Sequence, residues 1–148
     1  MSRGLAVLLG ATAGALVGMQ APINSRLGRA VGTAQAATFS FLLGTALLVA
    51  IAAFWSGGGL AGLGNLGRAP WWALLGGLLG AVYVTVALVA VRTLGVSGLT
   101  AVVIGGQLAM SVLIDRFGLL GVAKQQIGAQ RILGLVLLAA GVLLVVRR

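Results

Sequence analysis

Long uncharged segments dominate the sequence and limit what the chain can fold into. No charged side chain occurs in residues 4–25, 30–67, 69–91, 93–114 and 132–146. An α-helix needs about 20 mainly apolar residues to cross the hydrocarbon core of a bilayer. The chain is 60% apolar and 7% charged, whereas an ordinary soluble domain is about 25% charged. The sequence therefore predicts an all-α integral membrane protein.

The uncharged segments predict a single domain over residues 1–148 with five membrane-spanning helices. Segment 30–67 holds one helix and then a loop, because residues 56–67 are rich in glycine and poor in helix formers. The last segment is short, but Arg131 can extend it by placing its guanidinium at the membrane interface. Tryptophans at the predicted helix ends suit the headgroup level, namely Trp55, Trp71 and Trp72. The expected helices cover residues 4–22, 33–55, 71–91, 97–116 and 129–146.

The inventory of reactive side chains argues against an enzyme and against a metal or cofactor site. The chain has no Cys and no His, and Asp115 is its single acidic residue. Thiol chemistry, His-based acid–base catalysis and His- or Cys-ligated zinc are therefore absent. The net charge of +9 suggests a nucleic-acid binder, but the basic residues stand one or two at a time between apolar segments. Such spacing indicates membrane anchors that face anionic headgroups, with no nucleic-acid partner.

The basic residues do not select an orientation in the membrane. If the chain crosses the membrane five times, the ten basic residues divide equally between the two sides. One side holds Arg3, Arg68, Arg116, Lys124 and Arg131, and the opposite side holds Arg26, Arg29, Arg92, Arg147 and Arg148. Orientation normally follows an excess of Lys and Arg in the cytoplasmic loops. Equal numbers favour insertion in both orientations and an antiparallel homodimer, a 5+5 inverted-repeat bundle. The alternative is that the equality is coincidental.

Glycines four residues apart predict close packing between helices. Small residues at this spacing form a flat stripe along a helix, which lets two backbones approach each other in lipid. The first three predicted helices carry such stripes, whose glycines are Gly10, Gly14, Gly18, Gly44, Gly76 and Gly80. The sequence therefore predicts a tightly packed bundle.

Polar side chains inside the predicted spans are candidate pathway residues, because polar groups are costly in a bilayer. They are Gln20, Asn24, Ser40, Thr45, Tyr83, Gln107, Ser111 and Asp115. Pro22 lies between the first two and is expected to interrupt the first helix. The last three form one stripe at i, i+4 and i+8, which faces another helix or a water-filled path. Asp115 either couples proton movement to transport or pairs with a nearby cation.

Several motifs resemble the YdcZ-like family of small membrane proteins in the drug/metabolite transporter superfamily. They are PWWALLGGLLGAVYVT, LGVSGLTAVVIGGQLAMSVLIDRFGLLG, the run ATFSFLLGT, and a last helix that ends in VVRR. The resemblance covers essentially the whole chain. It implies a five-helix unit that occurs singly, in pairs or fused as inverted halves, in the bacterial cytoplasmic (inner) membrane.

Three functions are compatible with these features. The resemblance implies a secondary transporter of a small polar or amphipathic solute, with a path between two inverted subunits. A dual-topology passive channel and a non-transporting assembly subunit are the alternatives. The expected partners are a second copy, the lipid bilayer and a small-molecule substrate, and no cofactor is expected.

Overall fold

The computed structural model describes residues 1–55 and 59–147. Within these residues the chain forms helices and no strands, and four helices are long and apolar enough to cross a membrane. The chain divides into two compact units, residues 1–92 and residues 93–148. The prediction of an all-α membrane protein is confirmed, whereas the fifth crossing stays a prediction.

Helix α1 (Arg3–Val31) is longer than the sequence predicts. The prediction that it ends at residue 22, with Pro22 interrupting it, is wrong, because Pro22 lies inside a continuous helix. Proline removes one backbone donor and crowds the preceding turn. Asn24, Ser25 and Gly28 beyond it are buried and contact neighbouring helices, so tertiary packing maintains the helix beyond the proline.

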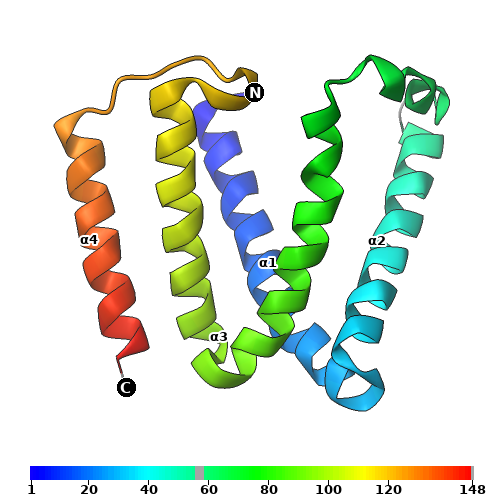
Figure 1. Cartoon of the computed structure of the whole chain (residues 1–148), viewed down its shortest axis with the longest axis horizontal. Coiled ribbons are helices and arrows are strands. Elements are labelled where there is room, and N and C mark those ends of the chain that lie inside the picture. The colour runs from blue at the N-terminus through cyan, green and yellow to red at the C-terminus, as the bar shows by residue number, and fades with distance from the viewer. Residues whose placement is uncertain (56–58, 148) are drawn as a thin grey trace. The chain divides into compact units, whose positions relative to one another are not determined.

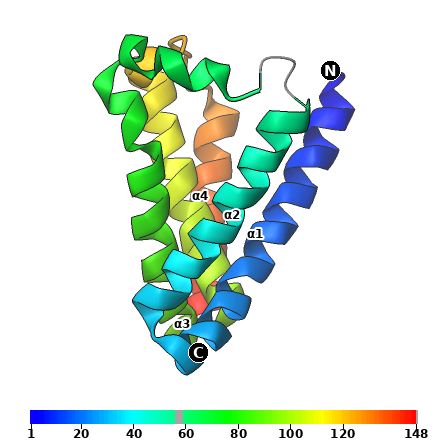
Figure 2. The same cartoon turned by 90° about the vertical axis from the view of Figure 1, so that its right-hand side faces the viewer.

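Helix α2 (Thr33–Trp55) has the bounds that the sequence predicts. It follows α1 after a single residue, Gly32, whose φ of 99° lies in the region that favours glycine. The Gly32 N–H donates to the carbonyl oxygen of Gly28 at 3.0 Å and caps α1. The two helices lie together near this connection in both views (Figures 1 and 2). The side chain of Trp55 lies outside the described residues.

The predicted loop 56–67 is partly helical. Residues 56–58 lie outside the described residues, but the 3-10 helix η1 (Ala61–Arg68) covers most of the remainder. A second 3-10 helix, η2 (Trp71–Leu75), occupies the predicted start of the third membrane helix. Trp71 and Trp72 are exposed there. The α-helical hydrogen-bonding pattern begins only at Gly76.

Helix α3 (Gly76–Phe117) contains two helical segments that meet at Gly95. Gly95 has φ 69° and ψ 175°, a conformation that essentially only glycine adopts. The sequence predicts a wider gap, over residues 92–96, but this one residue is enough to break the hydrogen-bond ladder. A continuous helix of 42 residues would measure about 63 Å, roughly twice the hydrocarbon thickness.

The core of the first unit lies between α1, α2 and the first segment of α3. Ala36, Ala37, Val84 and Leu88 form it, and Leu27 and Tyr83 pack against it. Ala36 and Leu88 are fully buried. This small core fixes the end of the unit at which α1 joins α2.

The second unit contains the last segment of α3, the short 3-10 helix η3 (Leu119–Gly121) and α4 (Ala129–Val146). Helix α4 has the bounds that the sequence predicts. Gly118 ends α3 in a left-handed conformation, with φ 65° and ψ 36°, as is common at the C-terminus of a helix.

Candidate substrate pathway

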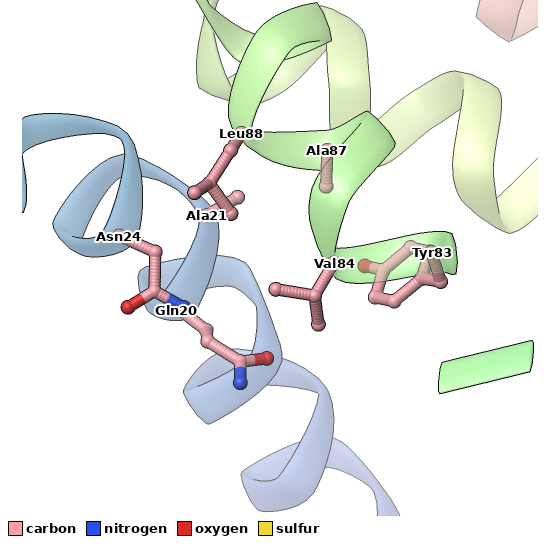
Figure 3. A pocket seen from close by; sticks show the side chains of 7 residues that line it. All are labelled: Gln20, Ala21, Asn24, Tyr83, Val84, Ala87 and Leu88. Carbon is pink, nitrogen blue, oxygen red and sulfur yellow. The ribbon is translucent and has the colours of Figure 1, made fainter. Parts of the chain in front are cut away.

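A small pocket in the first unit brings together three of the predicted pathway residues, Gln20, Asn24 and Tyr83. Figure 3 shows the Gln20 carboxamide and the Tyr83 hydroxyl on either side of Val84. Ala21, Val84, Ala87 and Leu88 complete the lining. The pocket is therefore mainly apolar, with hydrogen-bonding groups at its edge.

Asn24 bonds to α2 rather than to the pocket. Its Nδ2 donates to Ser40 Oγ at 2.8 Å, and the Ser40 hydroxyl donates to Asn24 Oδ1 at 3.1 Å. Asn24 is buried, with 6% of its surface exposed. The sequence placed Asn24 and Ser40 on the substrate path, and in this structure each satisfies the other and joins α1 to α2.

Gln20 and Tyr83 differ from Asn24, because neither side chain has a hydrogen-bond partner among the residues that the structure describes. Gln20 is exposed and Tyr83 is half-buried. Gln20 lies one turn before Asn24 on the same face of α1, which places its carboxamide beside the pocket. These two side chains retain the capacity to bond a solute.

Thr45 lies elsewhere, in an open groove between α2 and the first segment of α3. Ala34, Phe41, Leu42, Thr45, Ala81 and Thr85 are among the residues that line this groove. The Thr85 hydroxyl donates to the carbonyl oxygen of Ala81 in its own helix, at 2.8 Å. The groove is therefore more apolar than its composition suggests.

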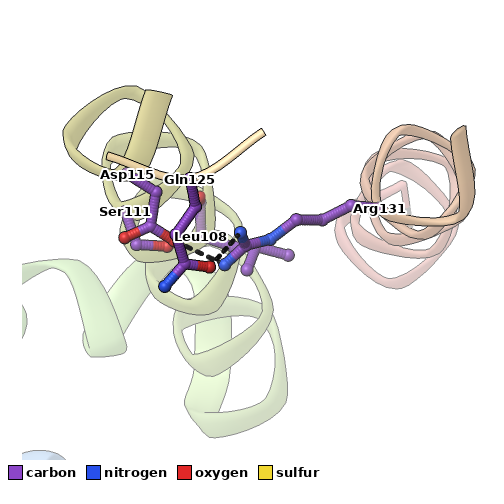
Figure 4. Close-up of polar contacts among 5 residues, drawn as sticks. All are labelled: Leu108, Ser111, Asp115, Gln125 and Arg131. Atoms are coloured by element: carbon purple, nitrogen blue, oxygen red, sulfur yellow. Dashed lines mark hydrogen bonds and ion pairs between the residues drawn. The ribbon is translucent and has the colours of Figure 1, made fainter. Parts of the chain in front are cut away.

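Asp115 forms an ion pair in the second unit. Arg131 Nη2 lies 2.5 Å from Asp115 Oδ2, and Arg131 Nη1 donates to Gln125 Oε1 at 3.5 Å. The Gln125 backbone N–H also donates to the Asp115 carbonyl oxygen, at 2.8 Å. Figure 4 shows Arg131 extending from α4 to this cluster. Of the two roles that the sequence allows Asp115, the structure displays pairing.

The other two residues of the predicted stripe on α3, Ser111 and Gln107, differ in whether their side chains have a hydrogen-bond partner. The Ser111 hydroxyl donates to the carbonyl oxygen of Leu108 at 2.9 Å, so its own helix satisfies it. Gln107 is exposed, and its carboxamide has no hydrogen-bond partner among the described residues. Gln107 is therefore the member of the stripe that most needs a partner outside the unit.

Arg92 makes polar contacts between helices that the sequence analysis did not predict, because that analysis considered only the charge of Arg92. Its Nε donates to Ser25 Oγ at 3.2 Å, and its Nη2 donates to Thr33 Oγ1 at 3.4 Å. One side chain of α3 thus bonds to both α1 and α2. The sequence did contain a signal that could have identified this contact, because Arg92 is the single charged residue between Arg68 and Asp115.

Most of the predicted packing glycines face no other helix among the described residues. A Cβ added at Gly10, Gly14, Gly18, Gly44 or Gly76 would meet nothing within 4 Å. At Gly80 it would lie 3.5 Å from Cζ of Phe41, an ordinary contact. Close helix packing through the other five glycines stays a prediction.

The apolar helices and the polar groups placed among them define a multi-pass membrane protein. A family model described as "Putative inner membrane exporter, YdcZ" matches residues 5–144. The chain therefore belongs to the YdcZ family, a family of membrane transporters rather than a class of enzymes, and its location is the inner membrane. No curated protein and no solved structure matches the chain.

Proposed function

We propose that the protein exports a small, uncharged polar or amphipathic solute by alternating access, at the interface of two copies inserted in opposite orientations. The observation that carries this proposal is a pair of polar side chains, Gln20 and Tyr83, that have no hydrogen-bond partner among the described residues and lie beside a mainly apolar pocket. Each unsatisfied polar group in hydrocarbon costs several kcal/mol. A solute or water that bonds to these groups removes that cost.

The lining of the pocket supports the proposed class of solute. A carboxamide and a phenol bond to hydroxyl, amide or carbonyl groups without needing a charge. The pocket itself holds only about 10 Å³, the space of one water, so a solute would bond at its edge, where the exposed Gln20 lies. The single acidic side chain of the sequence, Asp115, is paired with Arg131, so the described residues offer no free carboxylate side chain to bind a cation.

Two features support an inverted pair. The basic residues divide equally between the sides that five crossings would define, which removes the usual determinant of orientation. The exposed Gln107 carboxamide also needs a partner when it lies in the bilayer. Inverted-repeat carriers place their substrates near the midplane between the repeats, and a second copy would supply the missing polar groups there.

The proposal is tested with protein reconstituted into liposomes. Neutral polar solutes that stabilise the purified protein in a thermal-shift screen are loaded, and their flux is measured for wild type, Gln20→Leu, Tyr83→Phe and Gln107→Leu. Gln126→Leu is the matched control, because Gln126 is exposed in the segment between α3 and α4. Loss of one hydrogen bond to the solute predicts a decrease of about tenfold in transport.

Each other outcome contradicts a particular part of the proposal. If Gln20→Leu, Tyr83→Phe and Gln107→Leu all transport as well as Gln126→Leu, the pathway lies elsewhere. Flux at the rate of an ion channel would support the passive channel, and no flux of any solute would support the assembly subunit. A Gln107→Leu protein that no longer dimerises would give Gln107 a structural role.

A further inference from the structure

Among the described residues, the partners of the Arg92 guanidinium are neutral hydroxyl groups. Nε bonds to the Ser25 hydroxyl and Nη2 to the Thr33 hydroxyl. A guanidinium has five N–H donors, so donors remain that have no acceptor among the described residues. The single acid of the sequence, Asp115, is paired with Arg131. The described residues therefore orient Arg92 but do not neutralise its charge.

Gly28 makes room for this guanidinium. A Cβ at Gly28 would lie 3.1 Å from Arg92 Nη2 and 3.6 Å from the Cβ of Ala36. The first distance is tighter than most real Cβ contacts allow, and Gly28 is buried. An alanine at this position would move the guanidinium away from α1 while leaving every charge in place.

Two further arginines are sequence neighbours of the residues that Arg92 approaches. Arg26 and Arg29 directly follow Ser25 and Gly28 in α1, the two residues that the Arg92 guanidinium approaches. Both arginines are exposed, and residues 1–92 contain no acid. We name Arg26, Arg29 and Arg92 the arginine cluster. It concentrates positive charge at the end of the first unit.

The chemistry of the cluster selects a phosphate group. Guanidinium groups bond to phosphate oxygens through two parallel N–H donors, and they remain charged at all relevant pH values. The cluster lies where α1 ends and α2 begins, which is the depth of the lipid headgroups for helices that cross the bilayer. Basic pockets between membrane helices bind anionic headgroups in this way.

An apolar groove begins next to the cluster. Ala34, which lines the groove between α2 and α3, directly follows Thr33, whose hydroxyl bonds to Arg92. Phe41, Leu42 and Ala81 continue the lining. We propose that the arginine cluster binds the phosphate of an anionic membrane phospholipid, with an acyl chain along this groove.

The test measures lipid binding by native mass spectrometry on the full-length protein, transferred into a neutral detergent and offered phosphatidylglycerol or phosphatidylcholine. Wild type should prefer phosphatidylglycerol. Arg26→Gln with Arg29→Gln should weaken that binding about tenfold or more, as expected for the loss of two headgroup-facing cations. Gly28→Ala should weaken it with no change in charge.

The matched control is Arg3→Gln with Arg68→Gln, which removes the same charge from the side opposite the cluster in the five predicted crossings and should weaken binding less than about threefold. The proposal is overturned if this control loses as much affinity as the Arg26 and Arg29 variant, or if both lipids bind equally. Inorganic phosphate alone is the second probe. If it displaces phosphatidylglycerol at the same ionic strength at which chloride does not, the site recognises the phosphate group alone, and the proposed acyl-chain contact along the groove is overturned.

Discussion

Replacing Gly95 by alanine should destabilise the protein through the backbone alone. Gly95 has φ 69° and ψ 175°, and a Cβ there would meet nothing within 4 Å. The substitution therefore adds no steric clash with a neighbour. Holding a non-glycine residue in so sparsely populated a conformation costs about 1–3 kcal/mol.

The matched control is Gly134→Ala in α4. Gly134 lies inside a regular helix, and a Cβ there would also meet nothing within 4 Å. Alanine is favoured over glycine in a helix by about 0.5–1 kcal/mol, so this variant should be slightly more stable than wild type. The two variants should differ by roughly 1.5–4 kcal/mol in the free energy of unfolding.

The assay is equilibrium unfolding in mixed micelles, with helix content followed by circular dichroism. Equal stability of the two variants would mean that residue 95 is helical in the membrane. Helix α3 would then be continuous over its 42 residues and much longer than one crossing requires. That result would refute the interpretation of its two segments as separate crossings.

Three further predictions follow from the contacts and charges. Asn24→Leu should lower the stability of the first unit by about 1–2 kcal/mol, because it removes both bonds to Ser40. Ser40→Ala should cost at least as much, because it removes the same two bonds and leaves the buried Asn24 carboxamide unpaired; unfolding of both variants measures this, and a clearly smaller loss for Ser40→Ala would contradict it. A double-mutant cycle of Asp115→Asn and Arg131→Gln should give a coupling of about 0.5–1 kcal/mol, and zero coupling would mean that the pair contributes nothing. Adding three lysines to the loop that carries Arg68 should fix one orientation and abolish transport until a version with the opposite bias is co-expressed; full activity of one version alone would exclude an inverted pair.

Hydrophobic pattern was sufficient where helix ends coincide with changes of composition. Both bounds of α2 and α4 were predicted, because each helix lies between clear glycine or charge signals. The end of α1 was not, since the effect of Pro22 on one backbone bond is outweighed by packing of Asn24 and Gly28 that the local sequence does not reveal. The bounds of α3 failed similarly, because composition does not specify 3-10 geometry or the single residue at which a helix breaks.

The candidate site was predictable only as a set of polar side chains. Gln20 and Tyr83 do share a pocket, but the list did not reveal which members satisfy one another. Asn24 and Ser40 are hydrogen-bonded to each other, and Asp115 is paired with Arg131. Such pairings depend on the relative rotation of two helices, which a single sequence does not specify. The same reason explains why Arg92 was counted only as a charge.

The orientation of the protein in the membrane tests the proposed inverted pair most directly. The chain has no cysteine, so Ala123→Cys, in the exposed segment between α3 and α4, introduces a single thiol without changing the charge balance. The unmodified chain serves as the unlabelled control. An impermeant thiol reagent, applied to intact and then to opened cells, should label about half of the protein from each side if neither orientation is favoured. Labelling of nearly all molecules from one side would contradict the inverted pair.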